Sequence, residues 1–181
     1  VPFYSIQINV DQRCLIPRPE TEYMIEIIKN NISAPKKILD VGTGSGCIAL
    51  MMKKLFPDSE VHAVDISNDA ITLAKENAEI NNLEVNFYQS DLLTNVEKLD
   101  FDLIVANLPY IPTSNLPTLQ KEVIDYEPLI ALDGGEDGLL YINKLLDNLK
   151  NTNSNELVLV LEVDISHAQS LRDSITDWKD V

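Results

Sequence analysis

The segment Asn107-Leu108-Pro109-Tyr110 has the residue types needed to hold a planar NH2 group. The side-chain oxygen of Asn107 and the main-chain carbonyl of Leu108 could each accept a hydrogen bond from that group. Pro109 restricts Leu108 to the β or polyproline region and so directs this carbonyl, while Tyr110 offers a flat face. Such a clamp leaves the nitrogen lone pair exposed, which a neutral, weak nucleophile needs to attack an electrophilic methyl group. The alternative is a turn that merely ends a strand.

Three glycines alternate with two hydroxyl residues in Gly42-Thr43-Gly44-Ser45-Gly46, which follows an apolar run and precedes a helical pattern. Glycine allows close approach of a ligand, and a helix N-terminus offers unpaired N–H groups to a carboxylate or phosphate. A P-loop would need Gly-Lys-Ser/Thr, and a dinucleotide fingerprint would need GxGxxG. Cys47 follows the last glycine and fits neither pattern. A tight turn without a ligand stays the alternative.

Two aspartates follow the next two apolar runs. Asp65 lies 23 positions after Gly42, close to the offset of about 20 residues at which an acidic side chain accepts hydrogen bonds from ribose hydroxyls. Asp91 is placed to meet an adenine amino group, with Leu92 beside the ring. The pattern therefore predicts a cofactor that contains adenosine. The alternatives are a helix cap at Asp65 and a plain turn residue at Asp91.

The elements that must position these residues alternate along the chain. Short apolar runs predict buried strands at 36–41, 60–65, 84–88, 101–106 and 156–163. Helical patterns lie between them at 47–55, 67–80 with Ser67 as N-cap, 138–149 and 166–175. This alternation predicts an α/β fold with a doubly wound, mostly parallel sheet. Before the first strand, Met24, Ile27, Ile28 and Ile32 have the spacing of one apolar helix face, which we expect to cover the sheet.

Length and charge restrict the remaining possibilities. The chain has 181 residues, enough for one domain, and its net charge of -15 makes nucleic acid an unfavourable partner. Cys14 and Cys47 form no CxxC pair, so we expect neither a disulfide framework nor a metal site. Neither a membrane span nor a signal sequence is predicted, and we expect a cytoplasmic protein. The missing initial Met and the strand-like end at 178–181 suggest a partial chain.

Four motifs in order resemble one family. They are Pro17-Arg18-Pro19-Glu20-Thr21-Glu22, the glycine loop, Asn107-x-Pro-Tyr110, and Glu127-Pro128 followed by Ala131-Leu132-Asp133-Gly134-Gly135-Glu136-Asp137-Gly138-Leu139. Together they resemble the class I S-adenosylmethionine-dependent methyltransferases, in particular the release factor glutamine methyltransferases (the PrmC/HemK family). The resemblance covers the chain from about Phe3 to its end.

The resemblance implies a Rossmann-like catalytic domain that methylates the Gln of the Gly-Gly-Gln motif in peptide chain release factors. S-adenosylmethionine would be the donor and S-adenosylhomocysteine the product, with no metal. The implied catalytic residues are Asn107, Leu108, Pro109 and Tyr110. The implied cofactor residues are Gly42, Thr43, Gly44, Ser45, Gly46, Asp65, Ile66, Asp91, Leu92 and Asn107. Residues 1–35 would be a strand, loop and covering helix of the catalytic domain, and 36–181 the methyltransferase domain, without the family's N-terminal helical domain.

Several features leave alternatives open. The family usually has Pro where this chain has Leu108, and Asn-Leu-Pro-Tyr also resembles the motif of ribosomal RNA adenine dimethyltransferases. An amino methyltransferase acting on nucleic acid (N6-adenine), or a non-catalytic S-adenosylmethionine-binding module, is therefore the alternative function. Asp164 departs from the family's Leu-Glu-Ile-Gly pattern. Arg18 could steer a cofactor carboxylate or the substrate, or pair with Glu20 or Glu22.

Overall fold

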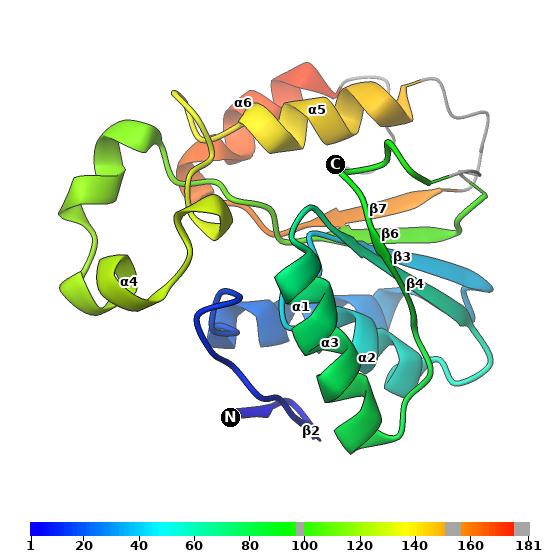
Figure 1. Ribbon diagram of the computed structural model, residues 1–181. Coiled ribbons are helices and arrows are strands. Elements are labelled where there is room, and N and C mark those ends of the chain that lie inside the picture. The colour runs from blue at the N-terminus through cyan, green and yellow to red at the C-terminus, as the bar shows by residue number, and fades with distance from the viewer. Residues whose placement is uncertain (97–99, 151–156, 176–181) are drawn as a thin grey trace.

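A parallel sheet forms the centre of the computed structural model, which describes residues 1–96, 100–150 and 157–175 (Figure 1). Its five strands lie in the order β5-β4-β3-β6-β7, and all neighbours are parallel. The strands are β3 (Lys37–Val41), β4 (Glu60–Asp65), β5 (Asn86–Gln89), β6 (Leu103–Ala106) and β7 (Val158–Leu161). This confirms the predicted doubly wound fold. The predicted strand-like end at 178–181 lies outside the described residues.

Both faces of the sheet are buried, because successive side chains of its central strands enter two different clusters. Ile38 on β3 packs into the cluster that holds α1 and α2 (Pro19–Asn31 and Cys47–Leu55), whereas Leu39 packs into the cluster that holds α5 (Leu140–Leu149). A strand covered on both faces is mostly apolar, which explains why β3, with Ile38, Leu39 and Val41, and β6 could be predicted from short apolar runs.

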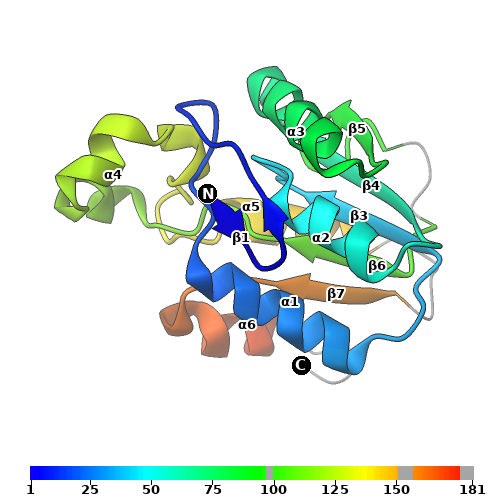
Figure 2. The same cartoon turned by 90° about the horizontal axis from the view of Figure 1, so that it is seen from below.

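The helices divide between the two faces. Figures 1 and 2 show α1, α2 and α3 (Asn68–Asn81) on one face, and α5 with α6 (Ala168–Ser174) on the other. The predicted N-cap of α3 is confirmed, since the Ala70 N–H donates to Ser67 Oγ at 3.3 Å. The predicted helix 166–175 is divided, because a 3-10 turn η3 (Ile165–His167) precedes α6.

The predicted apolar face of α1 needs one correction. Ile27 is 57% exposed, while the buried residues of the helix are Thr21, Met24, Ile25 and Ile28. Their spacing of i, i+3, i+4 and i+7 is also one helix face, rotated from the predicted one. Ile25 faces the core instead of Ile27, whereas Met24 and Ile28 are buried as predicted and Ile32 packs against the core, so the apolar pattern identified the helix and most of the face that it buries.

Two regions were predicted without bounds or not at all: a strand was expected within residues 1–35 but not placed, and the segment between β6 and α5 was not assigned elements. A small antiparallel hairpin, β1 (Pro2–Phe3) with β2 (Ile6–Gln7), precedes α1 and contributes Phe3 and Ile6 to the core. Between β6 and α5 the chain forms η1 (Thr113–Thr118), α4 (Lys121–Tyr126) and η2 (Leu129–Ala131), which project to one side of the sheet in Figure 1. Within the described ranges, no helix has the length and hydropathy required to span a membrane.

Candidate functional site

A pocket lies at the carboxyl ends of the strands, where open α/β sheets bind ligands. Its lining includes the predicted residues Gly42, Thr43, Gly44, Ser45, Asp65, Ile66, Asp91, Leu92, Asn107, Leu108 and Pro109. Two predicted residues, Gly46 and Tyr110, do not line it. The structure thus brings together eleven of the thirteen candidate residues, which come from the ends of four different strands.

The glycine loop turns from β3 into α2 and forms one wall of the pocket. Gly46 is the N-cap of α2 with φ +82, and a Cβ there would lie 3.0 Å from the Cβ of Ala74 on α3. Its lack of a side chain therefore serves the close packing of α2 against α3. Leu108 is 4% exposed and fills the space beside Gly42, where a Cβ would lie 2.9 Å from Leu108 Cδ2.

Asp40, at the end of β3, is the ionisable group of the loop that the sequence analysis did not single out. It is fully buried, and Oδ2 accepts hydrogen bonds from Thr43 Oγ1 at 2.6 Å and from the Ala49 N–H at 3.1 Å. Among the described residues Oδ1 has no partner. Burial raises the pKa of Asp40 to about 7. This carboxylate holds the glycine loop against the start of α2.

Asp65 joins the second strand to the same loop. Its Oδ2 accepts from the Gly44 N–H at 2.8 Å, and its Oδ1 accepts from the Ser67 N–H at 2.9 Å. Burial raises the pKa of Asp65, and these backbone hydrogen bonds oppose the rise. A carboxylate has about four lone-pair sites, so Asp65 can still accept from a diol. Asp65 lines the pocket, and its ribose contact stays a prediction.

Asp91 and Leu92 line the pocket beyond Asp65. Asp91 is exposed, and Leu92 has φ 48, so the backbone bends sharply after β5. Ser90 supports this bend, since its Oγ accepts from the Asn95 N–H at 3.0 Å. The apolar side chain of Leu92 and the carboxylate of Asp91 are thus beside one another at the pocket wall.

Asn107 follows β6, and its amide is oriented by α1. Nδ2 donates to Thr21 Oγ1 at 3.3 Å, and Thr21 is only 2% exposed. With the NH2 group facing Thr21, the oxygen Oδ1 is the end of the amide that remains to accept hydrogen bonds. Both residues line the pocket, and Thr21 was not predicted as a site residue.

A third group, Glu162, completes this cluster at the end of β7. Burial raises the pKa of Glu162, and hydrogen bonding by Thr21 and Asn107 opposes that rise. Its Oε2 is buried and has no hydrogen-bond partner among the described residues. Sequence analysis missed Glu162, although it follows a buried strand as Asp65 and Asn107 do. The same rule about carboxyl ends could have found it.

Gly134, in the motif that follows Glu127-Pro128, supports the backbone of the Asn107–Tyr110 segment. A Cβ on Gly134 would lie 2.8 Å from the carbonyl oxygen of Pro109 and 2.8 Å from the Cα of Tyr110. The Gly134 N–H also donates to the Ile111 carbonyl at 2.8 Å. The pKa of the half-buried Tyr110 is raised, first by burial and then by the negative charges of Glu162, Asp164 and Glu20.

Arg18 has a different partner from either that we expected. Its Nη2 donates to Glu127 Oε1 at 2.6 Å, and the Glu127 side chain is only 4% exposed. Glu22 instead accepts a hydrogen bond from the Tyr4 N–H at 2.9 Å. Pro17 and Pro128, the neighbours of the ion pair, both line the pocket. The pair therefore joins two of the predicted motifs at the edge of the site.

Asp164, the residue that departs from the family pattern, caps η3. Its Oδ1 accepts hydrogen bonds from the Ser166 hydroxyl at 2.6 Å and from the Ser166 N–H at 2.8 Å, and these bonds lower the pKa of Asp164.

The two cysteines, Cys14 and Cys47, both line the pocket, and burial raises the pKa of their thiols to about 11 and about 12. Among the described residues no group of three or more His, Cys, Asp or Glu could hold a metal ion.

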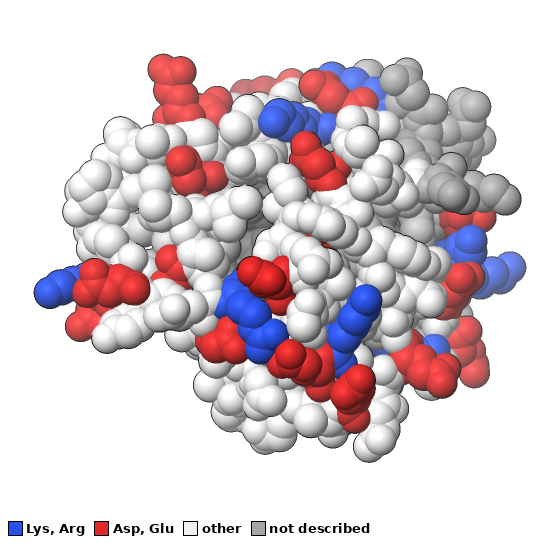
Figure 3. Space-filling view, viewed as in Figure 1, with Lys and Arg blue, Asp and Glu red and all other residues white. Residues whose placement is uncertain are grey.

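The distribution of charged side chains on the surface is relevant to whether nucleic acid could bind. Figure 3 shows the basic side chains of one face lying mostly beside acidic ones, and the surface is hollowed beside the lobe that carries α4. With a net charge of -15, such a surface would repel a phosphate backbone.

Known proteins match this chain in sequence. A family model described as "Methyltransferase small domain" matches residues 19–126. The release factor glutamine methyltransferase of Lactococcus lactis subsp. lactis (strain IL1403) is 40% identical over 171 residues, which cover 94% of this chain and 63% of that protein. The chain thus spans less than two thirds of that relative's length. The resemblance inferred from the four motifs is confirmed.

Solved structures agree with the fold. The ribosomal protein L11 methylase from Lactobacillus delbrueckii subsp. bulgaricus has a TM-score of 0.66 and 23% identity, with 88% of this chain and 69% of that chain covered. A chain of the E. cuniculi Mtq2–Trm112 complex, responsible for methylation of the termination factor eRF1, has a TM-score of 0.64 and 19% identity, with 91% and 84% covered. At these identities the likeness concerns the fold alone.

Proposed function

Because the chain belongs to the methyltransferase small domain family, we propose that it methylates the side-chain amide of the Gln in the Gly-Gly-Gln motif of peptide chain release factors. The observation that carries this proposal is the oriented amide of Asn107, whose NH2 group faces Thr21 and leaves Oδ1 as an acceptor. An acceptor at this position suits a substrate that presents its own NH2 group. The 40% identical relative named for this activity supports the substrate.

The pocket residues fit S-adenosylmethionine as the methyl donor. Ser45 and the loop before α2 would hold its methionine part, Asp65 its ribose hydroxyls, and Ile66, Asp91 and Leu92 its adenine. The acceptors and apolar side chains needed for these three parts line one continuous pocket. When bound, this cofactor supplies an electrophilic methyl group on a sulfonium and leaves as S-adenosylhomocysteine.

The protein's own contribution is alignment and charge placement. Asn107 Oδ1 and the Leu108 carbonyl would accept the two hydrogens of the substrate amide, while Tyr110 packs beside its side chain. As the N–C bond forms, the amide nitrogen becomes positive and then loses one proton to water. With the substrate amide beside Tyr110, the negative charges that raise the pKa of Tyr110 would favour the positive charge on this nitrogen. A strong general base is therefore not required.

Residues 1–35 would belong to the same catalytic unit. This is supported by the packing of α1 residues and Phe3 into the core and by the contacts of Thr21 and Arg18 with residues near the pocket. We expect the enzyme to act in the cytoplasm, where release factors work.

The test is methyl transfer from labelled S-adenosylmethionine to a purified release factor, beside a factor whose Gly-Gly-Gln Gln is replaced by Ala. Total RNA serves as a parallel substrate. Label on the wild-type factor alone is the expected result. Label on RNA alone would contradict the proposal and favour the amino methyltransferase of nucleic acid. Cofactor binding with no transfer to either substrate would indicate a binding module.

A further inference from the structure

We infer that Asn77, on α3, is a positioning residue that joins the glycine loop to a segment in front of the pocket. We call this segment, residues 9–17, the strap, because its residues Arg13, Cys14, Leu15 and Pro17 line the pocket. Asn77 is fully buried and does not itself line the pocket. The inference rests on the proposed cofactor site, whose two walls are the glycine loop and the strap.

Asn77 uses its whole amide to connect these two walls. Nδ2 donates to the Ser45 carbonyl at 2.8 Å and to the Asn9 carbonyl at 3.0 Å, and Oδ1 accepts from the Asn9 N–H at 2.8 Å. Because both Nδ2 hydrogens meet carbonyls, the orientation of the amide is fixed. One side chain thus satisfies three backbone groups from two segments that are far apart in the sequence.

Of these three hydrogen bonds, the one to the Ser45 carbonyl involves a residue of the proposed cofactor site. Ser45 is 2% exposed and lines the pocket, and the next residue, Gly46, has a left-handed φ of +82. A buried carbonyl without a partner is costly, so Asn77 stabilises the one loop conformation in which Ser45 has this position. Without Asn77, the glycine loop would have to be ordered when the cofactor binds, and this ordering would lower the affinity for the cofactor.

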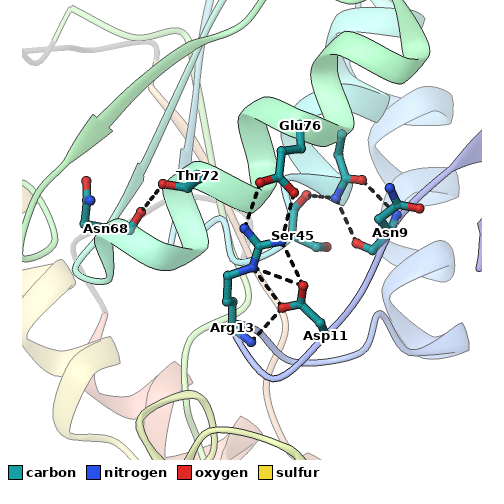
Figure 4. Close-up of polar contacts among 8 residues, drawn as sticks. Asn9, Asp11, Arg13, Ser45, Asn68, Thr72 and Glu76 are labelled. Carbon is teal, nitrogen blue, oxygen red and sulfur yellow. Dashed lines mark hydrogen bonds and ion pairs between the residues drawn. The ribbon is translucent and has the colours of Figure 1, made fainter.

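Glu76, the residue before Asn77 on α3, forms a second connection to the strap through Arg13. Arg13 donates through Nη1 and Nη2 to the two carboxylate oxygens of Glu76 at 2.9 and 2.8 Å, and it also donates to Asp11 (Figure 4). The side chain of Arg13 is 29% exposed and those of Asp11 and Glu76 are 48% and 47% exposed, so solvent screens these ion pairs and they contribute little. The buried amide of Asn77 is therefore the stronger connection.

Asn81, one turn later on α3, provides a matched control. Its Nδ2 donates to the Gln7 carbonyl at 2.7 Å, and its Oδ1 accepts from the Gln7 N–H at 3.2 Å. Asn81 thus holds the backbone two residues before Asn9 as Asn77 holds Asn9. Its third hydrogen bond goes to the Asn77 carbonyl at 2.8 Å, so in the described structure it has no bond to the glycine loop.

The experiment compares Asn77→Ala with Asn81→Ala by calorimetric titration with S-adenosylhomocysteine, after circular dichroism shows both variants folded. We expect Asn77→Ala to bind about tenfold more weakly than wild type and Asn81→Ala within about threefold of it. In methyl transfer, KM for S-adenosylmethionine should rise in Asn77→Ala alone. At saturating cofactor, kcat of the two variants should agree within about twofold.

Equal losses of affinity in the two variants would overturn the inference, because they would show that Asn77 acts only through the backbone of residues 7–9. If Asn77→Ala does not fold, Asn77→Ser and Asn81→Ser replace the pair, since a hydroxyl retains one hydrogen bond. Wild-type protein that binds no S-adenosylhomocysteine would overturn the proposed function, and the inference with it.

Discussion

The orientation of Asn107 can be tested by replacing the hydroxyl that holds it. Thr21→Val keeps the shape of a side chain that is 2% exposed but removes the acceptor of the Asn107 Nδ2 hydrogen bond. The NH2 group of Asn107 then keeps only its hydrogen bond to Glu162, so the amide is held less firmly and more often presents its NH2 group to the substrate, where only an oxygen can accept. We expect a lower kcat with an unchanged KM for S-adenosylmethionine, because Thr21 acts on the methyl acceptor side.

The size of the effect follows from the length of the bond. The distance of 3.3 Å between Asn107 Nδ2 and Thr21 Oγ1 is longer than usual for an N–H···O hydrogen bond. The net free energy of this bond therefore lies near the lower end of the range for neutral hydrogen bonds. A contribution of about 0.5–1 kcal/mol corresponds to a roughly two- to fivefold fall in kcat. The pH dependence should change as well, because the Thr21 hydroxyl helps to lower the pKa of Glu162. Without it, protonation of Glu162 should affect kcat at a higher pH.

The assay is steady-state methyl transfer to a release factor as a function of pH, with Thr21→Ser as the matched control. The serine hydroxyl can occupy the same place, so Thr21→Ser should recover kcat to within about twofold of wild type. Wild-type kcat in Thr21→Val would refute the assigned orientation. Equal losses in the valine and serine variants would show that the methyl group of Thr21, and not its hydroxyl, is what the site requires.

Three further changes test separate parts of the site. Asn107→Ala should lower kcat by about 10²-fold or more while cofactor affinity stays within a few fold, because it removes an acceptor used during transfer; equal losses in both would contradict this. Arg18→Ala should lower the free energy of unfolding by about 1–3 kcal/mol in urea, since it leaves Glu127 buried without its cation; an unchanged midpoint would contradict this. The raised pKa of Asp40, about 7, means that its contribution to stability is present below pH 4 and is lost as pH rises to 7. Asp40→Asn should therefore reduce the loss of stability between about pH 4 and 7, and an unchanged dependence of the free energy of unfolding on pH would show that Asp40 is not its source.

The sequence predicted best two elements whose apolar stretches have clear ends. The helix at 47–55 and the strand at 60–65 have the bounds of α2 and β4. In α2 the buried run 47–52 follows the glycine loop, and in β4 the buried Val61, Ala63 and Val64 lie between the charged Glu60 and Asp65. The edge strand was less well placed: β5 spans Asn86–Gln89 instead of 84–88, and three of its four residues are exposed. An edge strand with one partner lacks the apolar run that identifies a central one.

Residues that line the pocket were predictable where a local rule applied. Asp65 and Asn107 follow strands, and the carboxyl ends of parallel strands meet at one edge of the sheet. Gly46 shows the limit of that rule, because its neighbours in sequence line the pocket while its own position serves packing against Ala74. A glycine required by a helix–helix contact and one required by a ligand look the same in sequence.

Contacts between distant segments could not be predicted, and the motif at residues 17–22 shows why. Its Arg18 pairs with Glu127, 109 residues away, although Glu20 and Glu22 are nearer in sequence. Its Thr21 orients Asn107, 86 residues away. Neither residue has a spacing signal, since their partners are brought close only by the packing of α1 against the core. Through these two contacts the motif holds Glu127 and Asn107 in place, so residues before the sheet shape the pocket at the carboxyl ends of its strands.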